Sequence, residues 1–169
     1  MDAANPKDIE QIVRAVLNSL NKGASSAPVR SIGKRAPGVF EQLDDAVAAA
    51  AEAQKQLKSV AMRSLAVEAI RRAGVEHARE LAELAVTETG MGRVEDKIAK
   101  NISQARHTPG VECLTPRVLS GDKGLTLIEN AAWGVIASVT PSTNPAATVI
   151  NNAISMIAAG NTVVFAPHP

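Results

Sequence analysis

The chain has 169 residues, of which 46% are hydrophobic and 21% are charged, and its formal net charge is +1. This composition is typical of a globular protein of about one domain and argues against a disordered chain. The near-neutral charge and the scarcity of aromatic residues, with one Trp, two Phe and no Tyr, exclude a typical nucleic-acid-binding surface.

Neither a disulfide framework nor a membrane-inserted segment is predicted. Cys113 is the single cysteine, so no internal disulfide can form, and this usage suits a reducing cytoplasm. The first ten residues are polar and acidic, unlike a secretory signal peptide. No apolar run approaches the ~18 residues that a membrane-spanning helix needs, so we expect no membrane partner.

An amphipathic helix is predicted over residues 5–20, as part of a separate segment, residues 1–20. Asn5 is a suitable N-cap, and Pro6 suits the first helical position. Apolar residues at i, i+3, i+4, i+7, i+8 and i+11 form one stripe: Ile9, Ile12, Val13, Val16, Leu17 and Leu20. Residues 21–38 are rich in Gly, Ser and Pro and predict a flexible linker. We therefore expect the helix to be tethered to the body of the protein.

Four further helices are predicted before the first strand, over residues 43–57, 62–73, 77–85 and 94–106. In the second of these, one apolar side is expected to hold Met62, Leu65, Ala66, Ala69, Ile70 and Ala73. In the third, the corresponding side holds Ala78, Leu81, Ala82 and Ala85. Glycines separate the helices.

From residue 125 onward the hydrophobic pattern predicts strands as well as a helix, as in an α/β protein. Residues 125–130 and 133–139 predict strands, the second apolar enough to be buried on both faces. A helix over residues 145–159 and a strand over residues 162–166 follow. Strand, helix and strand with short connections predict a βαβ unit with parallel strands and a right-handed crossover. Because one such unit leaves its sheet short of partners, the sequence looks truncated within a larger, Rossmann-like nucleotide-binding domain.

The segment VTPSTNPAAT, residues 139–148, is rich in small polar residues and connects the predicted strand to the predicted helix. Open α/β sheets bind their ligands at such connections. Asn144 precedes Pro145 and is the natural N-cap. Capping would use the side-chain oxygen and leave the NH₂ group free to donate to a developing oxyanion. The alternative, which is the more common case, is that Asn144 is only a cap.

The crossover helix carries a narrow polar stripe of Thr148, Asn151, Asn152 and Ser155. Hydrogen bonding to neighbouring loops, or a subunit interface, explains this stripe better than ligand contact does. No G-x-G-x-x-G sequence follows either strand, so the commonest dinucleotide fingerprint is absent. His77 and His107 show no metal-ligand spacing with Cys113, and no metal site is predicted.

GVIASVTPSTNPAATVINNAISMIAAGNTVVFAPHP resembles the start of the cofactor domain of the aldehyde dehydrogenase superfamily. The usual pattern there is Pro-Trp-Asn-x-Pro, a helix, Ala-Gly-Asn-x-Val, a strand and Lys-Pro-Ser. Pro-Ser-Thr-Asn-Pro and Pro-His-Pro fit the CoA-acylating branch better. ETGMGRVEDK and TPGVE are similar to the acylating acetaldehyde and propionaldehyde dehydrogenases of bacterial microcompartments, those of ethanolamine utilisation above all. Residues 39–169 then form an incomplete, N-terminal part of the cofactor-binding domain.

The resemblance implies a site at the ends of the two parallel strands. Residues at the nicotinamide end of NAD would be Thr140, Pro141, Ser142 and Thr143, and those near the adenosine would be Ala166, Pro167 and His168. Asn144 would donate to the oxyanion, although it falls one position later than in the wider superfamily, so a backbone N–H could hold that role instead. Ala166 replaces a lysine of most members, which removes one contact to the ribose.

The activity so implied is the NAD-dependent conversion of acetaldehyde and coenzyme A to acetyl-CoA. Its nucleophilic cysteine belongs to a later domain, and Cys113, which lacks the motif of that nucleophile, is expected to be a small buried or half-buried residue, so this chain alone is expected to be inactive. The implied location is a microcompartment in the bacterial cytoplasm, with residues 1–20 binding a shell protein and with a homo-oligomer as the complete enzyme. The alternatives are a non-catalytic cargo or assembly module that retains this helix and, more weakly, a nucleotide-binding fragment with unrelated chemistry.

Overall fold

The computed structural model describes residues 37–168, and Gly38–Pro169 form one compact unit. The predicted helix over residues 5–20, its apolar stripe and nearly all of the predicted linker lie outside the described residues. The account below concerns the compact unit by itself.

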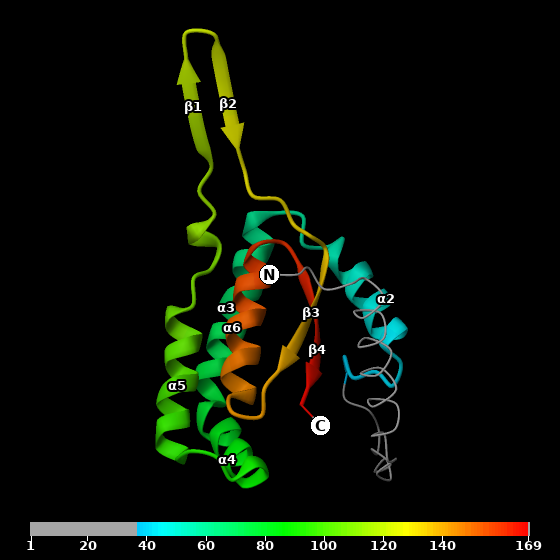
Figure 1. Ribbon diagram of the computed structural model, residues 1–169, viewed down its shortest axis with the longest axis vertical. Coiled ribbons are helices and arrows are strands. Elements are labelled where there is room, and N and C mark those ends of the chain that lie inside the picture. Colours follow the sequence, from blue (N-terminus) through cyan, green and yellow to red (C-terminus); the bar gives the residue numbers. More distant parts are fainter. Residues whose placement is uncertain (1–36, 169) are drawn as a thin grey trace, which may run out of the picture. The chain divides into compact units, whose positions relative to one another are not determined.

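Within residues 37–168, four α-helices precede the first strand, as the sequence predicts for this part of the chain (Figure 1). Their bounds are Leu43–Gln54 for α2, Val60–Glu76 for α3, Ala78–Thr89 for α4 and Val94–His107 for α5. The side-chain oxygen of Ser59 caps α3 by accepting from the N–H of Met62 at 3.1 Å. Gly90 ends α4 in the left-handed conformation, with φ of 64°, which glycine adopts without steric cost.

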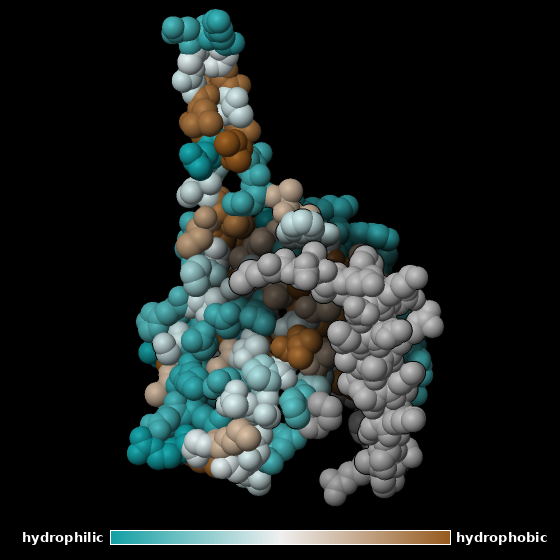
Figure 2. Space-filling model, viewed as in Figure 1, coloured by the Kyte–Doolittle hydropathy of each residue, from teal (hydrophilic) through white to brown (hydrophobic). Residues whose placement is uncertain are grey.

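A short 3₁₀ helix, η1 (Val111–Cys113), leads to an antiparallel hairpin of β1 (Arg117–Gly121) and β2 (Gly124–Ile128). The sequence predicts only the second of these strands. The hairpin extends away from the helices (Figure 1), and every one of its strand residues is exposed. Figure 2 shows hydrophobic side chains on it, which are Val118, Leu119, Leu125, Leu127 and Ile128.

The predicted βαβ unit is confirmed: β3 (Val135–Thr140), α6 (Pro145–Ala158) and β4 (Thr162–Pro167) follow in order. The two strands pair in parallel, from Val135 opposite Thr162 to Thr140 opposite Pro167. The expected burial of β3 on both faces is wrong. Its polar residues Ser138 and Thr140 are buried, whereas the side chain of Val139 is 78% exposed. In the described part of the chain, α6 covers the face that bears Ser138, and the carboxyl end of the opposite face is left open.

The core forms where α3, α5 and α6 meet. Its buried residues are Val67, Ala105, Ile150, Ile154 and Ala158, with Ile70, Val75, Val111 and Ile157 packed against them. Full burial of each large aliphatic side chain contributes about 1.5–3 kcal/mol. A Cβ at Gly74 would lie only 3.0 Å from the Cβ of Ala105, so glycine at this position lets α3 approach α5 closely.

The expected apolar side of α4 is confirmed, because Ala78, Ala82 and Ala85 are buried and Leu81 is half-buried. The expected side of α3 is wrong for Met62 and Leu65, which are exposed. These two side chains line an open apolar groove shared by α2, α3, α6 and β4. The core side of α3 is instead the one that bears Val67, Ile70 and Gly74.

Two arginines of α3 bind the carboxyl ends of the helices beside it. Arg71 donates to the carbonyl oxygens of Ala105 at 3.0 Å, Arg106 at 2.9 Å and Thr108 at 2.8 Å, at the end of α5. Arg63 donates to the carbonyl oxygen of Ala158 at 3.0 Å, at the end of α6. The last carbonyls of a helix lack partners within it, so these contacts satisfy both helix ends and fix their positions relative to α3.

We predict that Arg71→Met lowers the free energy of unfolding by about 2–3 kcal/mol, because three carbonyl oxygens lose a charged donor. The midpoint of urea unfolding, followed by circular dichroism, measures the change. Arg72→Met is the matched control, since Arg72 is exposed and makes no hydrogen bond or ion pair with the rest of the described residues. Equal midpoints for the two variants would contradict the capping role of Arg71.

Candidate functional site

The candidate site lies at the carboxyl ends of the parallel strands, where residues 140–144, here named the junction loop, connect β3 to α6. Pairing of the strands brings the two predicted groups of cofactor residues together. Val139 lies opposite Ala166 and Thr140 opposite Pro167, and the N–H of His168 donates to the carbonyl oxygen of Thr140 at 3.0 Å. An open cleft here is lined by Glu88, Thr89, Met91, Thr140, Pro141, Ser142, Pro145, Pro167 and His168.

The hydroxyl of Thr140 is the notable polar group of this cleft. Thr140 is 3% exposed, and its Oγ1 has no hydrogen-bond partner among the described residues. A buried hydroxyl without a partner is costly, and most such groups in proteins bond to protein, solvent or ligand. Thr140 therefore combines a place in the lining of the cleft with a buried hydroxyl that no described residue satisfies.

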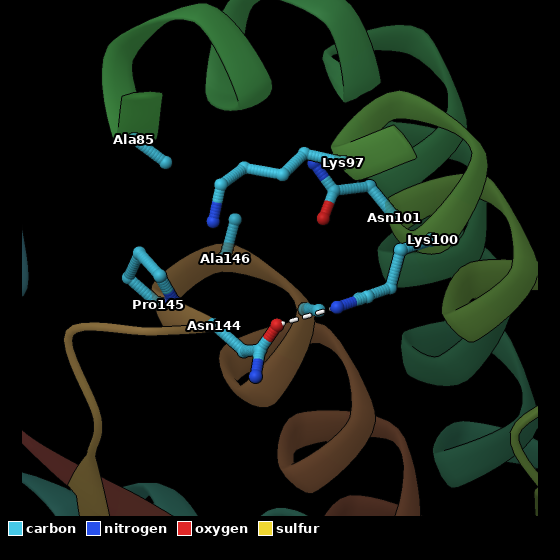
Figure 3. Close-up of a pocket in the computed structure, with 8 residues that line it drawn as sticks. Ala85, Lys97, Lys100, Asn101, Asn144, Pro145 and Ala146 are labelled. Atoms are coloured by element: carbon cyan, nitrogen blue, oxygen red, sulfur yellow. Dashed lines mark hydrogen bonds between the residues drawn. The ribbon is translucent and has the colours of Figure 1, made fainter. Parts of the chain in front are cut away.

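Asn144 occupies the N-cap position of α6, but the expectation that its side chain caps the helix is wrong. The helix begins with the bond from the N–H of Thr148 to the carbonyl oxygen of Asn144, and no side-chain cap bond forms. Instead, Oδ1 of Asn144 accepts from Nζ of Lys100 at 2.7 Å (Figure 3). Nδ2 makes one long contact of 3.4 Å, with Oγ1 of Thr143. The amide oxygen of Asn144 is thus bonded and its NH₂ group nearly free, as expected for a capping side chain. The donor to the oxygen, however, is the ammonium of Lys100 and not a backbone N–H of α6.

A second lysine of α5 holds the backbone of the same loop. Lys97 is 8% exposed, and its Nζ donates to the carbonyl oxygen of Thr143 at 2.9 Å. Figure 3 shows Lys97 and Lys100 reaching from α5 toward the start of α6. The sequence analysis missed both residues. Their i, i+3 spacing, which places two ammonium groups on one side of α5, is the signal that could have suggested a shared target.

The polar stripe of α6 is used mainly within the protein. Nδ2 of Asn151 donates to Oε1 of Gln104 at 2.9 Å and to Oγ1 of Thr108 at 3.1 Å, and Nδ2 of Asn152 donates to Oγ of Ser138 at 2.9 Å. These bonds attach α6 to α5 and to β3. They support the interpretation that Asn151 and Asn152 are structural.

Cys113 is exposed at the end of η1, so the expectation of a buried or half-buried residue is wrong.

A ring nitrogen of His77 contacts Glu80, and a ring nitrogen of His107 contacts Ser103. Each partner lies on the same helical segment as its histidine. Across residues 37–168, no group of three or more His, Cys, Asp or Glu side chains could hold a metal ion. The helices of this region include none long and apolar enough to span a membrane.

Residues 23–169 match the aldehyde dehydrogenase family. The chain is 72% identical, over 98% of its length, to acetaldehyde dehydrogenase (acetylating) EutE of Salmonella typhimurium, of which it covers 34%. A propionaldehyde dehydrogenase from the fucose utilisation bacterial microcompartment of Clostridium phytofermentans, solved as a cysteine-to-alanine mutant, is 51% identical with a TM-score of 0.76, over 78% of this chain and 31% of that chain.

A third similar protein is an engineered glycolyl-CoA reductase solved with bound NADP⁺. It is 47% identical with a TM-score of 0.74, over 78% of this chain and 31% of that chain. The predicted resemblance to CoA-acylating aldehyde dehydrogenases of microcompartments is confirmed by these relatives. The chain spans about a third of their length, and it belongs to the aldehyde dehydrogenase family.

Proposed function

We propose that residues 1–169 are the N-terminal third of an NAD-dependent, CoA-acylating acetaldehyde dehydrogenase of ethanolamine catabolism. The substrate and acyl acceptor follow from the high identity to an acetylating acetaldehyde dehydrogenase. The observation that carries the chemistry is the junction loop, in which Thr140, Pro141 and Ser142 line the cleft at the strand ends and Asn144, just after them, has its amide oxygen held by Lys100. In this proposal the nucleophilic cysteine lies outside residues 1–169.

The cleft fits a nicotinamide cofactor. Thr140 brings a hydroxyl that has no partner among the described residues to this strand end, and the N-terminus of α6 supplies backbone N–H groups and a partial positive charge beside the proposed nicotinamide end. The residues that would hold the cofactor are Thr140, Pro141, Ser142 and Thr143 on one strand end and Ala166, Pro167 and His168 on the other. NAD held there would supply the hydride acceptor for oxidation at the aldehyde carbon.

The proposed role of Asn144 is to donate from Nδ2 to the aldehyde oxygen as negative charge develops there. A donor aimed at an oxyanion stabilises the transition state more than the ground state, so its contribution falls on kcat. Because Oδ1 is already engaged by Lys100, the amide needs little reorganisation to present its NH₂ group. The nearby N-terminus of α6 adds a partial positive charge that favours the oxyanion.

Residues 1–20 are proposed as a helix that targets the enzyme to a bacterial microcompartment by docking on a shell protein, with residues 21–38 as the linker and residues 39–169 as the start of the cofactor domain. This rests on the apolar stripe of the predicted helix, which a short isolated helix cannot bury. The complete enzyme is proposed to be a homo-oligomer in the bacterial cytoplasm.

The whole proposal is tested with a chimera that joins residues 1–169 to the remaining two thirds of Salmonella typhimurium EutE. We expect the chimera to form NADH from acetaldehyde only when coenzyme A is present, at a rate within about tenfold of the intact relative, since a tenfold change corresponds to about 1.4 kcal/mol of barrier. NADH absorbance measures the rate. A well-folded chimera with no such activity would refute the proposed function.

Residues 1–169 alone are expected to show no NADH formation from acetaldehyde, with or without coenzyme A, because they lack the nucleophile. Cys113→Ala is expected to leave the chimera fully active, since Cys113 is exposed on η1 and does not line the cleft. Both rates come from the same absorbance assay. Activity of the isolated chain that disappears with Cys113→Ala would show that Cys113 is the nucleophile.

In the chimera, Asn144→Asp is expected to lower kcat by about 10²–10³, the usual cost of losing one oxyanion donor. A carboxylate can still accept from Lys100, so the loop contact remains while the NH₂ group is replaced by a charge that repels the oxyanion. The dissociation constant of NAD, measured by fluorescence titration, should change much less. Ser155→Ala, on an exposed position of the same helix, is the control. An unchanged kcat in Asn144→Asp would remove Asn144 from the mechanism.

Residues 1–22 fused to a fluorescent protein are expected to concentrate in microcompartments in cells that make shells. Ile12→Glu with Val16→Glu should leave the fusion diffuse, because two charges interrupt the apolar stripe. Fluorescence microscopy distinguishes the two distributions. Lys7→Glu with Arg14→Glu changes charges on the opposite face and serves as the control. The targeting role fails if the parent fusion is diffuse or if the stripe variant is enclosed equally well.

A further inference from the structure

We infer that Lys100 is a positioning residue that acts through Asn144, orienting its amide and strengthening its NH₂ group as a donor. This inference rests on the proposed oxyanion role of Asn144. It concerns a residue on a different element, α5, whose Nζ lies 2.7 Å from Oδ1 of Asn144. The two residues are 44 positions apart in the sequence, so only the packing of α5 against α6 brings them together.

The ammonium of Lys100 fixes which end of the Asn144 amide points toward α5. An asparagine side chain can rotate so that its oxygen and nitrogen exchange places. In the observed orientation Oδ1 accepts from Lys100, whereas the exchanged orientation would set the NH₂ group against an ammonium, which has no acceptor. Among residues 37–168, Nδ2 has only the 3.4 Å contact with Thr143 to compete with an incoming oxyanion. The lysine therefore leaves the NH₂ group available on one side.

The same contact makes the amide a better donor. A cation at the carbonyl oxygen draws electron density out of the amide, and hydrogen bonds in such a chain polarise and strengthen one another. Charge-assisted hydrogen bonds are also shorter and stronger than neutral ones, in agreement with the 2.7 Å distance. Both effects favour an oxyanion at Nδ2.

The arrangement of charges on α5 leaves Lys100 available for this contact. Asp96, one turn earlier on α5, is engaged through both carboxylate oxygens by Arg93, at 2.7 and 3.1 Å. No carboxylate within the described part of the chain pairs with Lys100. Lys97, on the preceding turn, holds the backbone carbonyl of Thr143, so the loop has a separate anchor that does not depend on Lys100.

The test uses the chimera with Lys100→Met, Lys100→Arg, Asn144→Ala and the double variant Lys100→Met with Asn144→Ala. Lys100→Met is expected to lower kcat about tenfold, the loss that removal of one charge-assisted hydrogen bond predicts, with KM for acetaldehyde and the dissociation constant of NAD within about twofold. Lys100→Arg should recover most of kcat because it restores a cation. The double variant should match Asn144→Ala, since Lys100 then has no amide to act on. Lys58→Met, an exposed lysine before α3, is the matched control and should change none of these values.

The possible results separate this inference from the proposal beneath it. If Asn144→Ala keeps the parent kcat, the oxyanion role fails and the inference fails with it. If Asn144→Ala is impaired but Lys100→Met is not, or if the two losses multiply in the double variant, the inference is overturned while the oxyanion role stands. A purely structural role of Lys100 would lower the melting temperature and kcat in both backgrounds, which the double variant also detects.

Discussion

The close packing of α3 against both α5 and α6 is the constraint on which the site depends. Gly74 allows this approach, since a Cβ there would lie 3.0 Å from that of Ala105. Arg71 and Arg63 then bind the carbonyl ends of α5 and α6, so one helix holds the carboxyl ends of two others. With both ends fixed, α5 and α6 lie side by side, and α5 meets the junction loop through its lysines. Contacts at the carboxyl ends of α5 and α6 thus help to place the two helices whose other ends meet at the junction loop.

The junction loop is bonded to α5 on one side and borders an open cleft on the other. On the side of α5, Lys97 and Lys100 bind the backbone of Thr143 and the side chain of Asn144. On the side of the strand ends, Thr140 presents a buried hydroxyl that no described residue satisfies. Buried polar groups without partners are few in folded proteins, so this hydroxyl needs a specific explanation. The bonds to α5 thus leave the other side of the loop bordering the open cleft.

The described residues also leave apolar surface that they do not cover. The hairpin of β1 and β2 exposes Val118, Leu125 and Leu127, and Val139 is exposed at the end of β3. Trp133, just before β3, is 92% exposed. Large aliphatic and aromatic side chains are usually buried in a folded domain, so this surface is unlike that of a self-sufficient domain. It agrees with a chain that spans about a third of the length of its relatives.

The sequence by itself determined the elements whose signals are local. Helix periodicity, Pro145 at the start of α6 and the alternation of strand and helix predicted four helices and the parallel βαβ unit. The strand ends that hold Thr140 and Ala166 followed from the same order of elements. β1 was missed because its residues, RVLSG, do not alternate between apolar and polar types as the LTL of β2 does, and its pairing with β2 is a contact between two chain segments.

Only the tertiary structure decided which polar groups meet. Local pattern made Asn144 a helix cap, but an ammonium from α5 competes for the same oxygen and binds it. Local pattern placed Leu65 in the core, but the helices that meet α3 pack on the side of Val67 and Gly74. Propensity and periodicity act within a few residues, whereas hydrogen-bond partners and helix faces depend on segments tens of residues apart. That the ends of the two parallel strands meet was therefore readable from the sequence, and the way Asn144 is held beside them was not.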